Sequence, residues 1–234
     1  MSYSYQGGEL EIFARAVNWK RYLKKQIELY IEGDVLEVGS GLSTNTRLLF
    51  NSSINSWTAL EPDLSLVDDI DKNWLDREPK IQILNGFLKD QSWSNKFDTI
   101  LYLDVLEHIQ NDIFEIDMAF AALKPGGNVV VVSPAHNYLF SEFDRSVGHY
   151  RRYSKQSIQK TKPKGAEIVR LDYLDCAGLI ASVANKLVLH QRNPSLHQIM
   201  IWDNILVKIS QWLDRVLRYR IGKSIIFIFK KPNP

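Results

Sequence analysis

The sequence predicts a doubly wound α/β fold built on a mostly parallel sheet, and three observations predict it. Short apolar segments alternate with helical segments along most of the 234 residues, as in sheets whose parallel strands are joined by helices. Residues 128–132 contain four consecutive valines, which suits a strand buried on both faces. A turn with two glycines, 39–43, joins the first of these strands to a helix.

The pattern assigns the elements in order. We expect strands at 34–38, 57–60, 80–84, 97–103, 128–132, 166–172 and 224–230, and helices at 9–31, 44–50, 63–74 and 112–123. The first helix has apolar residues at helical spacing and ends at Gly33. Ser43 is expected to cap the second helix, and Asp112 with Glu115 has the spacing of a capping box.

Two stretches depart from the alternation. Residues 134–153 have no clean periodicity, and loops of that length are usually functional. Residues 175–222 insert two predicted helices before the last strand, the second with a broad apolar face over 201–217. We therefore expect one domain over residues 1–234, with an N-terminal helical cap at 1–32 and a helical insertion or lid at 175–222.

Composition narrows the classes of protein and partner. With 45% hydrophobic residues and a net charge of +2, the chain reads as globular, and nucleic acid is not an expected partner. The single Cys176 excludes an intrachain disulfide and a thiolate zinc cluster, and it favours a reducing compartment. No apolar run reaches the ~18 residues of a membrane span. We expect a cytoplasmic protein with no transmembrane segment and no bound metal.

Polar and glycine residues gather where the first two strands end. Glu37, Gly39 and Gly41 come at the end of the first strand, and Glu61 closes the second. Ligands of open parallel sheets bind at these carboxyl ends. A dinucleotide fingerprint would need a third glycine where this chain has Thr44. Glu37 would also repel a diphosphate, so an NAD-dependent oxidoreductase is the less favoured alternative.

Four segments resemble the successive motifs of class I S-adenosylmethionine-dependent methyltransferases: LEVGSG (36–41), ALEPD (59–63), FDTILYLDVLEHI (97–109) and LKPGGNVVVVSP (123–134). The likeness covers roughly residues 30–175 and implies a seven-stranded sheet whose strand at 224–230 is antiparallel. The run FDRSVGHYRRYS (143–154) is similar to a bacterial subgroup whose acceptors are mostly unassigned. The resemblance implies S-adenosylmethionine as the cofactor.

The resemblance also implies how the cofactor is held: Glu37, Gly39 and Gly41 at the methionine portion, Glu61 at the ribose, Phe87 beside adenine and Asp104 at the sulfonium end. Two positions depart from the family pattern. Ser43 stands where many members have a third glycine, and Phe87 stands where an acidic residue often contacts the adenine amino group. Backbone groups or ring stacking would replace that contact.

The acceptor side has candidates with two interpretations each. A hydroxyl acceptor must lose a proton, so His108 and His149 are candidate catalytic residues; the alternative is that they organise loops. Tyr138, Arg151 and Arg152 are candidate acceptor-binding residues. The alternatives are aromatic packing for Tyr138 and internal ion pairs with Asp144 or Glu142 for the arginines. Glu107 is expected to interact with a helix dipole.

Basic residues of the first helix, together with Lys208, Arg215 and Arg218 of the last, admit a membrane-surface or lipid-linked substrate. We favour helices that cover the sheet or pair with a second subunit, because Asp203 and Asp214 dilute the positive face. The predicted activity is methyl transfer to a small-molecule or glycoconjugate acceptor, with O-methylation favoured. A non-catalytic cofactor-binding module that regulates a partner is the alternative, since intact cofactor motifs report binding and not turnover.

Overall fold

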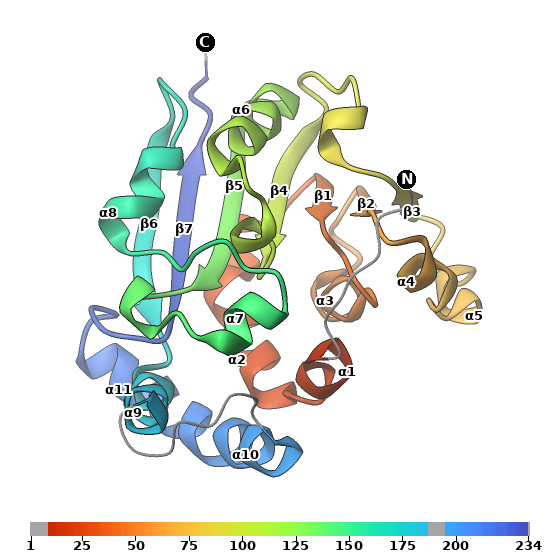
Figure 1. The fold of residues 1–234 in the computed structure, drawn as a ribbon. Helices are drawn as coiled ribbons and strands as arrows, with labels where there is room; N and C mark the ends of the chain where they lie inside the picture. Colours follow the sequence, from red (N-terminus) through yellow and green to blue (C-terminus); the bar gives the residue numbers. More distant parts are fainter. Residues whose placement is uncertain (1–8, 187–194, 234) are drawn as a thin grey trace.

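Seven strands form one sheet in the order β3-β2-β1-β4-β5-β7-β6 (Figure 1). The computed structural model describes residues 9–186 and 195–233. The strands are β1 (Asp34–Val38), β2 (Ser56–Glu61), β3 (Ile81–Asn85), β4 (Phe97–Leu103), β5 (Leu123–Pro134), β6 (Glu167–Leu174) and β7 (Ser224–Lys230). The first five pair in parallel, and β7 runs antiparallel to β5 and β6. The predicted fold class is confirmed.

Helices cover both faces of this sheet. They are α1 (Glu9–Ala14), α2 (Val17–Ile27), α3 (Thr44–Leu49), α4 (Leu64–Asp68), α5 (Lys72–Leu75), α6 (Asp112–Ala122), α7 (Glu142–Ser146), α8 (Lys155–Ile158), α9 (Cys176–Ala184), α10 (Leu196–Ile201) and α11 (Val207–Val216). A π-helical turn, η7 (Trp202–Leu206), joins α10 to α11. In the described part of the chain, no helix combines the length and the apolar character that a membrane crossing requires.

Two predicted helices are divided, and two predicted caps are wrong. The helix expected over 63–74 is divided into α4 and α5. The helix expected over 9–31 is interrupted before α2, because Ala16 has a ψ of 68° and leaves the helical region. Ser43 precedes α3 in the left-handed region, with a φ of 55°, and its side chain caps nothing. The cap of α6 is Asn111, whose side chain accepts a hydrogen bond from the backbone N–H of Phe114 at 3.2 Å. Asp112 is therefore already inside the helix.

The strands separate two cores because successive side chains point to opposite faces of a sheet. Val35, Leu101 and Val130 share one core with side chains of α2 and α10. Residues of the same three strands that point to the opposite face belong to the other core, under α6 and α8. They are Leu36, Val38, Ile100, Tyr102, Val129 and Val131. The valine-rich centre of β5 is fully buried, as its composition predicts.

The long segment 134–153 is closed at its base beside β5. Ala135 and Tyr153 form a parallel bridge. The N–H of Tyr153 donates to Pro134 at 2.9 Å, and that of His136 donates to Tyr153 at 2.7 Å. The segment carries the short helix α7, and Figure 1 shows α7 near α2 and α1 at the edge where β4 and β5 end. The predicted irregular loop is thus an ordered wall beside the carboxyl ends of the strands.

The inserted helices are attached through buried carboxylates, which corrects one expectation from the sequence. Asp203 accepts a hydrogen bond from the backbone of Trp19 at 2.8 Å. Asp214 accepts one from the Tyr22 hydroxyl at 2.8 Å and one from the backbone of Asp175 at 2.7 Å. Both acids are buried, so neither dilutes the positive face of the last helix. Residues 1–8 of the expected cap and 187–194 of the expected insertion lie outside the described residues.

Candidate functional site

A cavity of about 860 Å³ opens at the carboxyl ends of β1 and β4. Its wall combines the glycine turn 39–42, the end of β4 at 103–104, the loop segments 107–108 and 139–144, and parts of α2, α9 and α10. This volume is in the range of small-molecule sites. The cavity lies where ligands of open α/β sheets bind.

The glycine turn allows a ligand to approach the backbone. Gly39 has a φ of 69°, and a Cβ there would lie 2.7 Å from a methyl group of Val105, so only glycine fits. Gly41 has a φ of 52°, and its N–H donates to Oε2 of Glu61 at 2.7 Å. The turn after β1 is therefore fixed to the end of β2.

Glu61 is buried at the end of β2, outside the cavity wall. Its Oε1 accepts a hydrogen bond from the N–H of Asp63 at 2.9 Å, and its Oε2 accepts from Gly41. Burial raises the pKa of Glu61 above its usual range, and the two backbone hydrogen bonds oppose the rise. Each carboxylate oxygen can accept a second hydrogen bond, so ribose hydroxyls would still find acceptors here.

Glu37 is buried and also lies outside the cavity wall. Its Oε2 accepts hydrogen bonds from the Thr46 hydroxyl at 2.5 Å and from the indole N–H of Trp57 at 3.1 Å. Burial raises the pKa of Glu37 to about 7. Glu37 thus fixes α3 and β2 behind the glycine turn, and its predicted contact with the methionine portion of the cofactor stays a prediction.

Of the other two predicted cofactor residues, Asp104 lines the cavity and Phe87 does not. Asp104 has a φ of 56° at the end of β4. Asp104 is exposed to the cavity, and its partial removal from bulk water raises its pKa to about 6, against the opposing effects of His149, Lys223 and Lys20. The ring of Phe87 is 37% exposed beside the turn after β3. A flat exposed ring there remains compatible with adenine stacking.

The turn after β1 also carries two buried hydroxyls, those of Ser40 and Ser43, that have no hydrogen-bond partner within the described residues. Ser40 lines the cavity. Buried polar groups normally have partners, so the Ser40 hydroxyl points to a polar ligand at the turn, whereas Ser43 lies outside the cavity wall. Together with the bare backbone of Gly39, the Ser40 hydroxyl fits a cofactor that carries an amino-acid portion.

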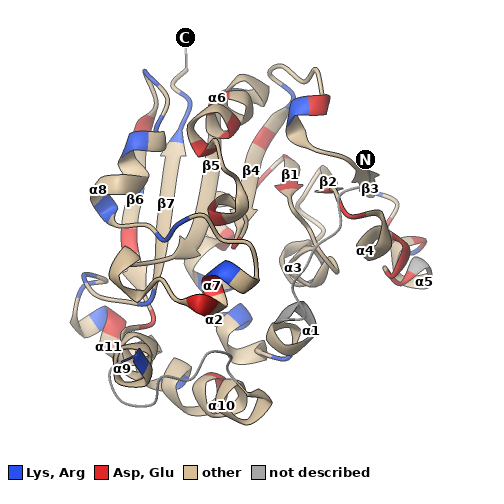
Figure 2. Cartoon of the chain, viewed as in Figure 1, with Lys and Arg blue, Asp and Glu red and all other residues tan. Residues whose placement is uncertain are grey.

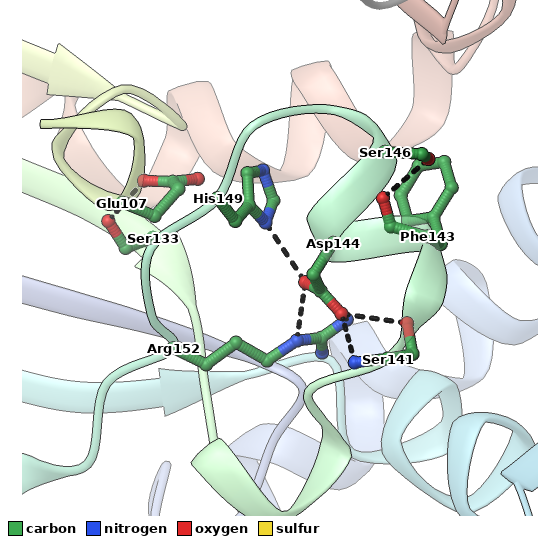
Figure 3. A network of polar contacts seen from close by, with 8 residues as sticks. All are labelled: Glu107, Ser133, Ser141, Phe143, Asp144, Ser146, His149 and Arg152. Carbon is green, nitrogen blue, oxygen red and sulfur yellow. Dashed lines mark hydrogen bonds and ion pairs between the residues drawn. The ribbon is translucent and has the colours of Figure 1, made fainter.

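On the acceptor side, Asp144 is the centre of a buried polar network (Figure 3). Its Oδ1 is 2.9 Å from Nδ1 of His149 and accepts from Nε of Arg152 at 2.8 Å. Its Oδ2 accepts from the N–H and the hydroxyl of Ser141, both at 2.8 Å. Burial acts to raise the pKa of Asp144, but the hydrogen bonds from His149 and Arg152 hold it well below its usual range.

The ionised Asp144 fixes the proton on His149. A carboxylate only accepts hydrogen bonds, so Nδ1 of His149 carries a proton, and in the neutral form of the ring the lone pair lies on Nε2. The His108 ring stands at 86° to the His149 ring, with the ring centres 4.5 Å apart. Burial lowers the pKa of His108 to about 4, and His149 adds to the effect. His108 is therefore neutral near pH 7.

Glu107 lies in the first turn of a short 3-10 helix, η3 (Leu106–His108), as expected, and beside the two histidines. It is fully buried, and its Oε2 accepts a hydrogen bond from the Ser133 hydroxyl at 2.8 Å. Figure 3 shows His149 between Glu107 and Asp144. Burial, reinforced by Asp104, raises the pKa of Glu107 well above its usual range. Glu107, His108 and His149 each bring a polar atom within 4.8 Å of the other two.

The three predicted acceptor-binding residues separate in space. Arg152 lines the cavity. Arg151 instead forms an ion pair with Asp112 at 2.6 Å and donates to the backbone of Gln110 at 2.7 Å. Tyr138 is 56% exposed and lies outside the cavity wall, with its ring 5.1 Å from that of His136. The roles of Arg151 and Tyr138 toward an acceptor stay predictions.

Sequence reasoning missed two cations of the cavity, Lys20 and Lys223. Lys20 donates to the Thr44 hydroxyl at 2.6 Å, and Lys223 lies 4.5 Å from the centre of the Trp202 ring. Burial lowers the pKa of both lysines, and Asp104 opposes the shift in each. No sequence signal marks Lys20, because it looks like one of several lysines on the polar side of a helix. The spacing Asp104-x-x-Glu107-His108 was a usable signal for Glu107.

The sheet order and the glycine turn define a Rossmann-like methyltransferase fold. Residues 14–165 match the sequence model of the methyltransferase domain family. The chain belongs to this family, which confirms the predicted class I methyltransferase and S-adenosylmethionine as its cofactor. A search of curated proteins gives no significant match.

Three solved structures illustrate the likeness of the fold. The [4+2]-cyclase SpnF has a TM-score of 0.64 and 16% identity, over 92% of this chain and 81% of that one. The N-methyltransferase NodS from Bradyrhizobium japonicum WM9, in complex with S-adenosyl-L-homocysteine, has a TM-score of 0.60 and 13% identity, over 94% of this chain and 88% of that one. A Haemonchus contortus phosphoethanolamine N-methyltransferase, in complex with phosphomonomethylethanolamine and S-adenosylhomocysteine, has a TM-score of 0.63 and 14% identity, over 97% of this chain and 58% of that one.

Proposed function

We propose that the protein transfers a methyl group from S-adenosylmethionine to a hydroxyl oxygen of a small-molecule or glycoconjugate acceptor. One observation carries the proposal. The same cavity is bordered by the glycine turn and Asp104 on one side and by His108, His149 and Arg152 on the other. A methyl donor at the turn and an acceptor at the histidines would therefore share one enclosed space.

The residues of the turn would hold the cofactor. The backbone of Gly39 and Gly41 and the hydroxyl of Ser40 would contact its amino-acid portion, and Glu61 its ribose hydroxyls. Asp104 and Glu37 supply negative charge near the cationic end of the molecule. When bound there, the cofactor supplies an activated methyl group on a sulfonium, and its carbon–sulfur bond breaks with the electron pair left on sulfur.

His149 would receive the proton of the acceptor hydroxyl. Its Nδ1 is held by Asp144, so Nε2 keeps the lone pair that a general base needs. As the oxygen–carbon bond forms, the hydroxyl proton passes to this nitrogen. His108 packs edge-to-face against the ring and limits its rotation. Asp144 would stabilise the resulting imidazolium, as a buried carboxylate does in hydrolytic triads.

Arg152 and the aromatic side chains of the wall favour a particular class of acceptor. Two nitrogens of Arg152 bond Asp144, and the guanidinium has further donors for an acceptor oxygen. Phe13, Trp19 and Phe143 give the cavity apolar walls. An acceptor with an apolar or sugar ring and a negatively charged or polar substituent would suit both features.

The test begins with binding, because the same fold also hosts a [4+2]-cyclase and fold does not determine chemistry. Calorimetric titration should give micromolar affinity for S-adenosylhomocysteine and none for NAD. Transfer of labelled methyl from S-adenosylmethionine should then be measured on phenols, sugars and glycolipids. Tight binding of S-adenosylhomocysteine without transfer to any acceptor would favour the regulatory module, and binding of NAD alone would favour the oxidoreductase.

Two variants connect transfer with the histidines. His149→Ala should lower turnover at least about 100-fold, the usual contribution of a general base, while affinity for S-adenosylhomocysteine is kept. His136→Ala is the matched control, since His136 lies outside the cavity wall and bonds the backbone of Gly222 at 2.9 Å. Equal losses of turnover in both variants would contradict the assignment of His149.

A further inference from the structure

Glu107, His108 and His149 have a donor set that the methyl-transfer proposal does not use in full. Their ligand atoms all lie within 4.8 Å of one another. One carboxylate with two imidazoles is a set that binds divalent first-row metals with coordination positions left open. We propose that this cluster binds one divalent transition-metal cation through an oxygen of Glu107 and one ring nitrogen of each histidine.

The contacts around the two histidines match those of metal-binding histidines. Such rings usually give their other nitrogen to a carboxylate or a backbone carbonyl, which fixes the orientation of the ring. Nδ1 of His149 bonds Asp144 at 2.9 Å, and His108 hydrogen-bonds the backbone of Val147. Each histidine also offers one ring nitrogen to the cluster.

Glu107 provides the observation that points most directly to a ligand. Its Oε2 is held by Ser133, while its Oε1 is buried and has no hydrogen-bond partner within the described part of the chain. An unpaired buried carboxylate oxygen is costly. A cation at the cluster would compensate this oxygen and would lie between three donors that the protein already orients.

The cation would also give the cluster a role in acceptor binding. This role rests on the proposed function, whereas the binding of the metal does not. Three protein ligands leave positions for oxygen atoms of an acceptor in the cavity. A cation on Nε2 of His149 would occupy the lone pair that the metal-free site offers as a base. The acceptor hydroxyl would then be activated by coordination, which lowers its pKa.

The test measures metal binding by the whole protein after removal of metals with a chelator. Calorimetric titration with ZnCl₂ should give one site, and CoCl₂ should give d–d absorption bands. Glu107→Gln and His108→Ala should each lower the affinity for Zn²⁺ at least about 10-fold, which is the lower end of the losses seen when metal sites are altered. His136→Ala is the control and should leave the affinity unchanged. Thermal melting establishes that the variants fold.

Each outcome decides the proposal. Absence of Zn²⁺ and Co²⁺ binding, or binding that survives both Glu107→Gln and His108→Ala, would overturn the metal site. S-adenosylhomocysteine affinity, measured on the same metal-free samples, separates this result from the methyl-transfer proposal. If that affinity is retained while metals fail to bind, His149 acts directly as a base. If it is absent, the proposed function fails by itself.

A second inference rests on a different part of the molecule, the outer face of α10, η7 and α11. Large apolar side chains are exposed there at spacings of three or four residues, which places them on one face of the helix. They are Ile201 (42% exposed), Ile205 (53%), Ile209 (43%), Trp212 (67%) and Val216 (59%). In Figure 2 the helices α9 and α10 are mostly tan, with few charged residues.

The charges of this face select one partner. Lys208, Arg215 and Arg218 are exposed, while Asp203 and Asp214 are buried, so the exposed charges over residues 195–221 are all positive. A second copy docked on the same face by a two-fold axis would bring these cations together. We infer that the stripe docks on an anionic membrane surface, with Trp212 at the interface and the cations on the headgroups.

Flotation with lipid vesicles tests this surface. The protein should bind vesicles that contain phosphatidylglycerol and not vesicles of phosphatidylcholine alone, and binding should weaken with salt. Trp212→Ser and the pair Lys208→Glu with Arg215→Glu should each reduce binding at least about fivefold, since each cation contributes about 1 kcal/mol. Phe114→Ser is the control, because Phe114 is 54% exposed on α6. Equal binding to both vesicles, or a dimer in solution that Trp212→Ser abolishes, would overturn the inference.

Discussion

The cofactor side and the acceptor side of the cavity are built from contacts of different range. Glu61 reaches Gly41 across 20 residues, and Glu37 reaches Thr46 across nine. The helical wall of the acceptor side depends on contacts across the whole chain, since Tyr22 bonds Asp214 across 192 residues and Trp19 bonds Asp203 across 184. The first side is therefore a product of consecutive βα units, whereas this wall of the second forms only when distant parts of the chain pack together.

The two sides also differ in how their charges are compensated. Glu37 and Glu61 are compensated by neutral hydrogen-bond donors, and burial raises the pKa of both. Asp144 is compensated by a cation, Arg152, and by His149, and its pKa is lowered. A positively charged ligand would therefore compensate Glu37 and Glu61, whereas Asp144 is already compensated within the protein. Four variants test this difference.

The largest effect is expected for Asp144→Ala. Removal of one partner of a buried ion pair leaves the other charge uncompensated and costs about 3–5 kcal/mol of unfolding free energy. Urea unfolding would measure it, with Glu142→Ala as the control on the same helix, where an exposed side chain should change stability by less than about 0.5 kcal/mol. A loss below 1 kcal/mol in Asp144→Ala would show that the network adds little stability.

A pH-dependent effect is expected for Glu37 in the cofactor-free protein. The usual pKa of the side chain is 4.5, and burial raises it to about 7. Between these values the folded state keeps a proton that the unfolded chain releases. The free energy of unfolding therefore decreases as pH rises from about 4.5 to about 7, by at most about 3 kcal/mol.

Urea unfolding at pH 5 and pH 8 measures this slope. Glu37→Gln should flatten the part of it that Glu37 contributes, because an amide does not titrate and can still accept from Thr46. Glu32→Gln is the control, since Glu32 is exposed just before β1. An identical slope in wild type and Glu37→Gln would mean that Glu37 is ionised throughout this range.

The difference in contact range also explains how much of the molecule could be predicted. The alternation of strands and helices, the glycine turn and the position of Glu61 follow from local patterns, because each βα unit places its own loop at the same edge of the sheet. The inward direction of Asp203 and Asp214 could not be predicted, because helical periodicity does not reveal which residues of α2 they meet. The same limit hid the cavity position of Lys20.

The acceptor residues show a mixed result for the same reason. The ion pair of Arg152 with Asp144, which was one alternative to acceptor binding, is present at 2.8 Å, since the two residues lie in one short segment. Glu107 was assigned to a helix dipole, but its surroundings come from β5 and the long loop. His108 and His149 lie in two loops that are distant in sequence, so no periodic pattern predicts that the two rings meet.

A smaller effect is expected for Glu61→Ala on cofactor affinity. Loss of charge-assisted hydrogen bonds to ribose hydroxyls should make the binding free energy of S-adenosylhomocysteine less favourable by about 1–3 kcal/mol. This corresponds to a roughly five- to 150-fold higher Kd. Calorimetric titration measures it, and Asp68→Asn, an exposed acid on α4, serves as the control. Unchanged affinity would remove Glu61 from the cofactor site.

The smallest effect is expected for Phe87→Ala, which asks how far the cofactor side extends beyond the cavity. Because the ring is 37% exposed, its removal should leave stability within about 0.5 kcal/mol of wild type. Stacking on adenine would nevertheless contribute about 0.5–1.5 kcal/mol to binding. S-adenosylhomocysteine should therefore bind about two- to tenfold more weakly, and homocysteine, which has no adenine, should bind equally to both proteins. If Phe87→Ala leaves both affinities unchanged, adenine lies elsewhere, and the cofactor side ends at Glu61.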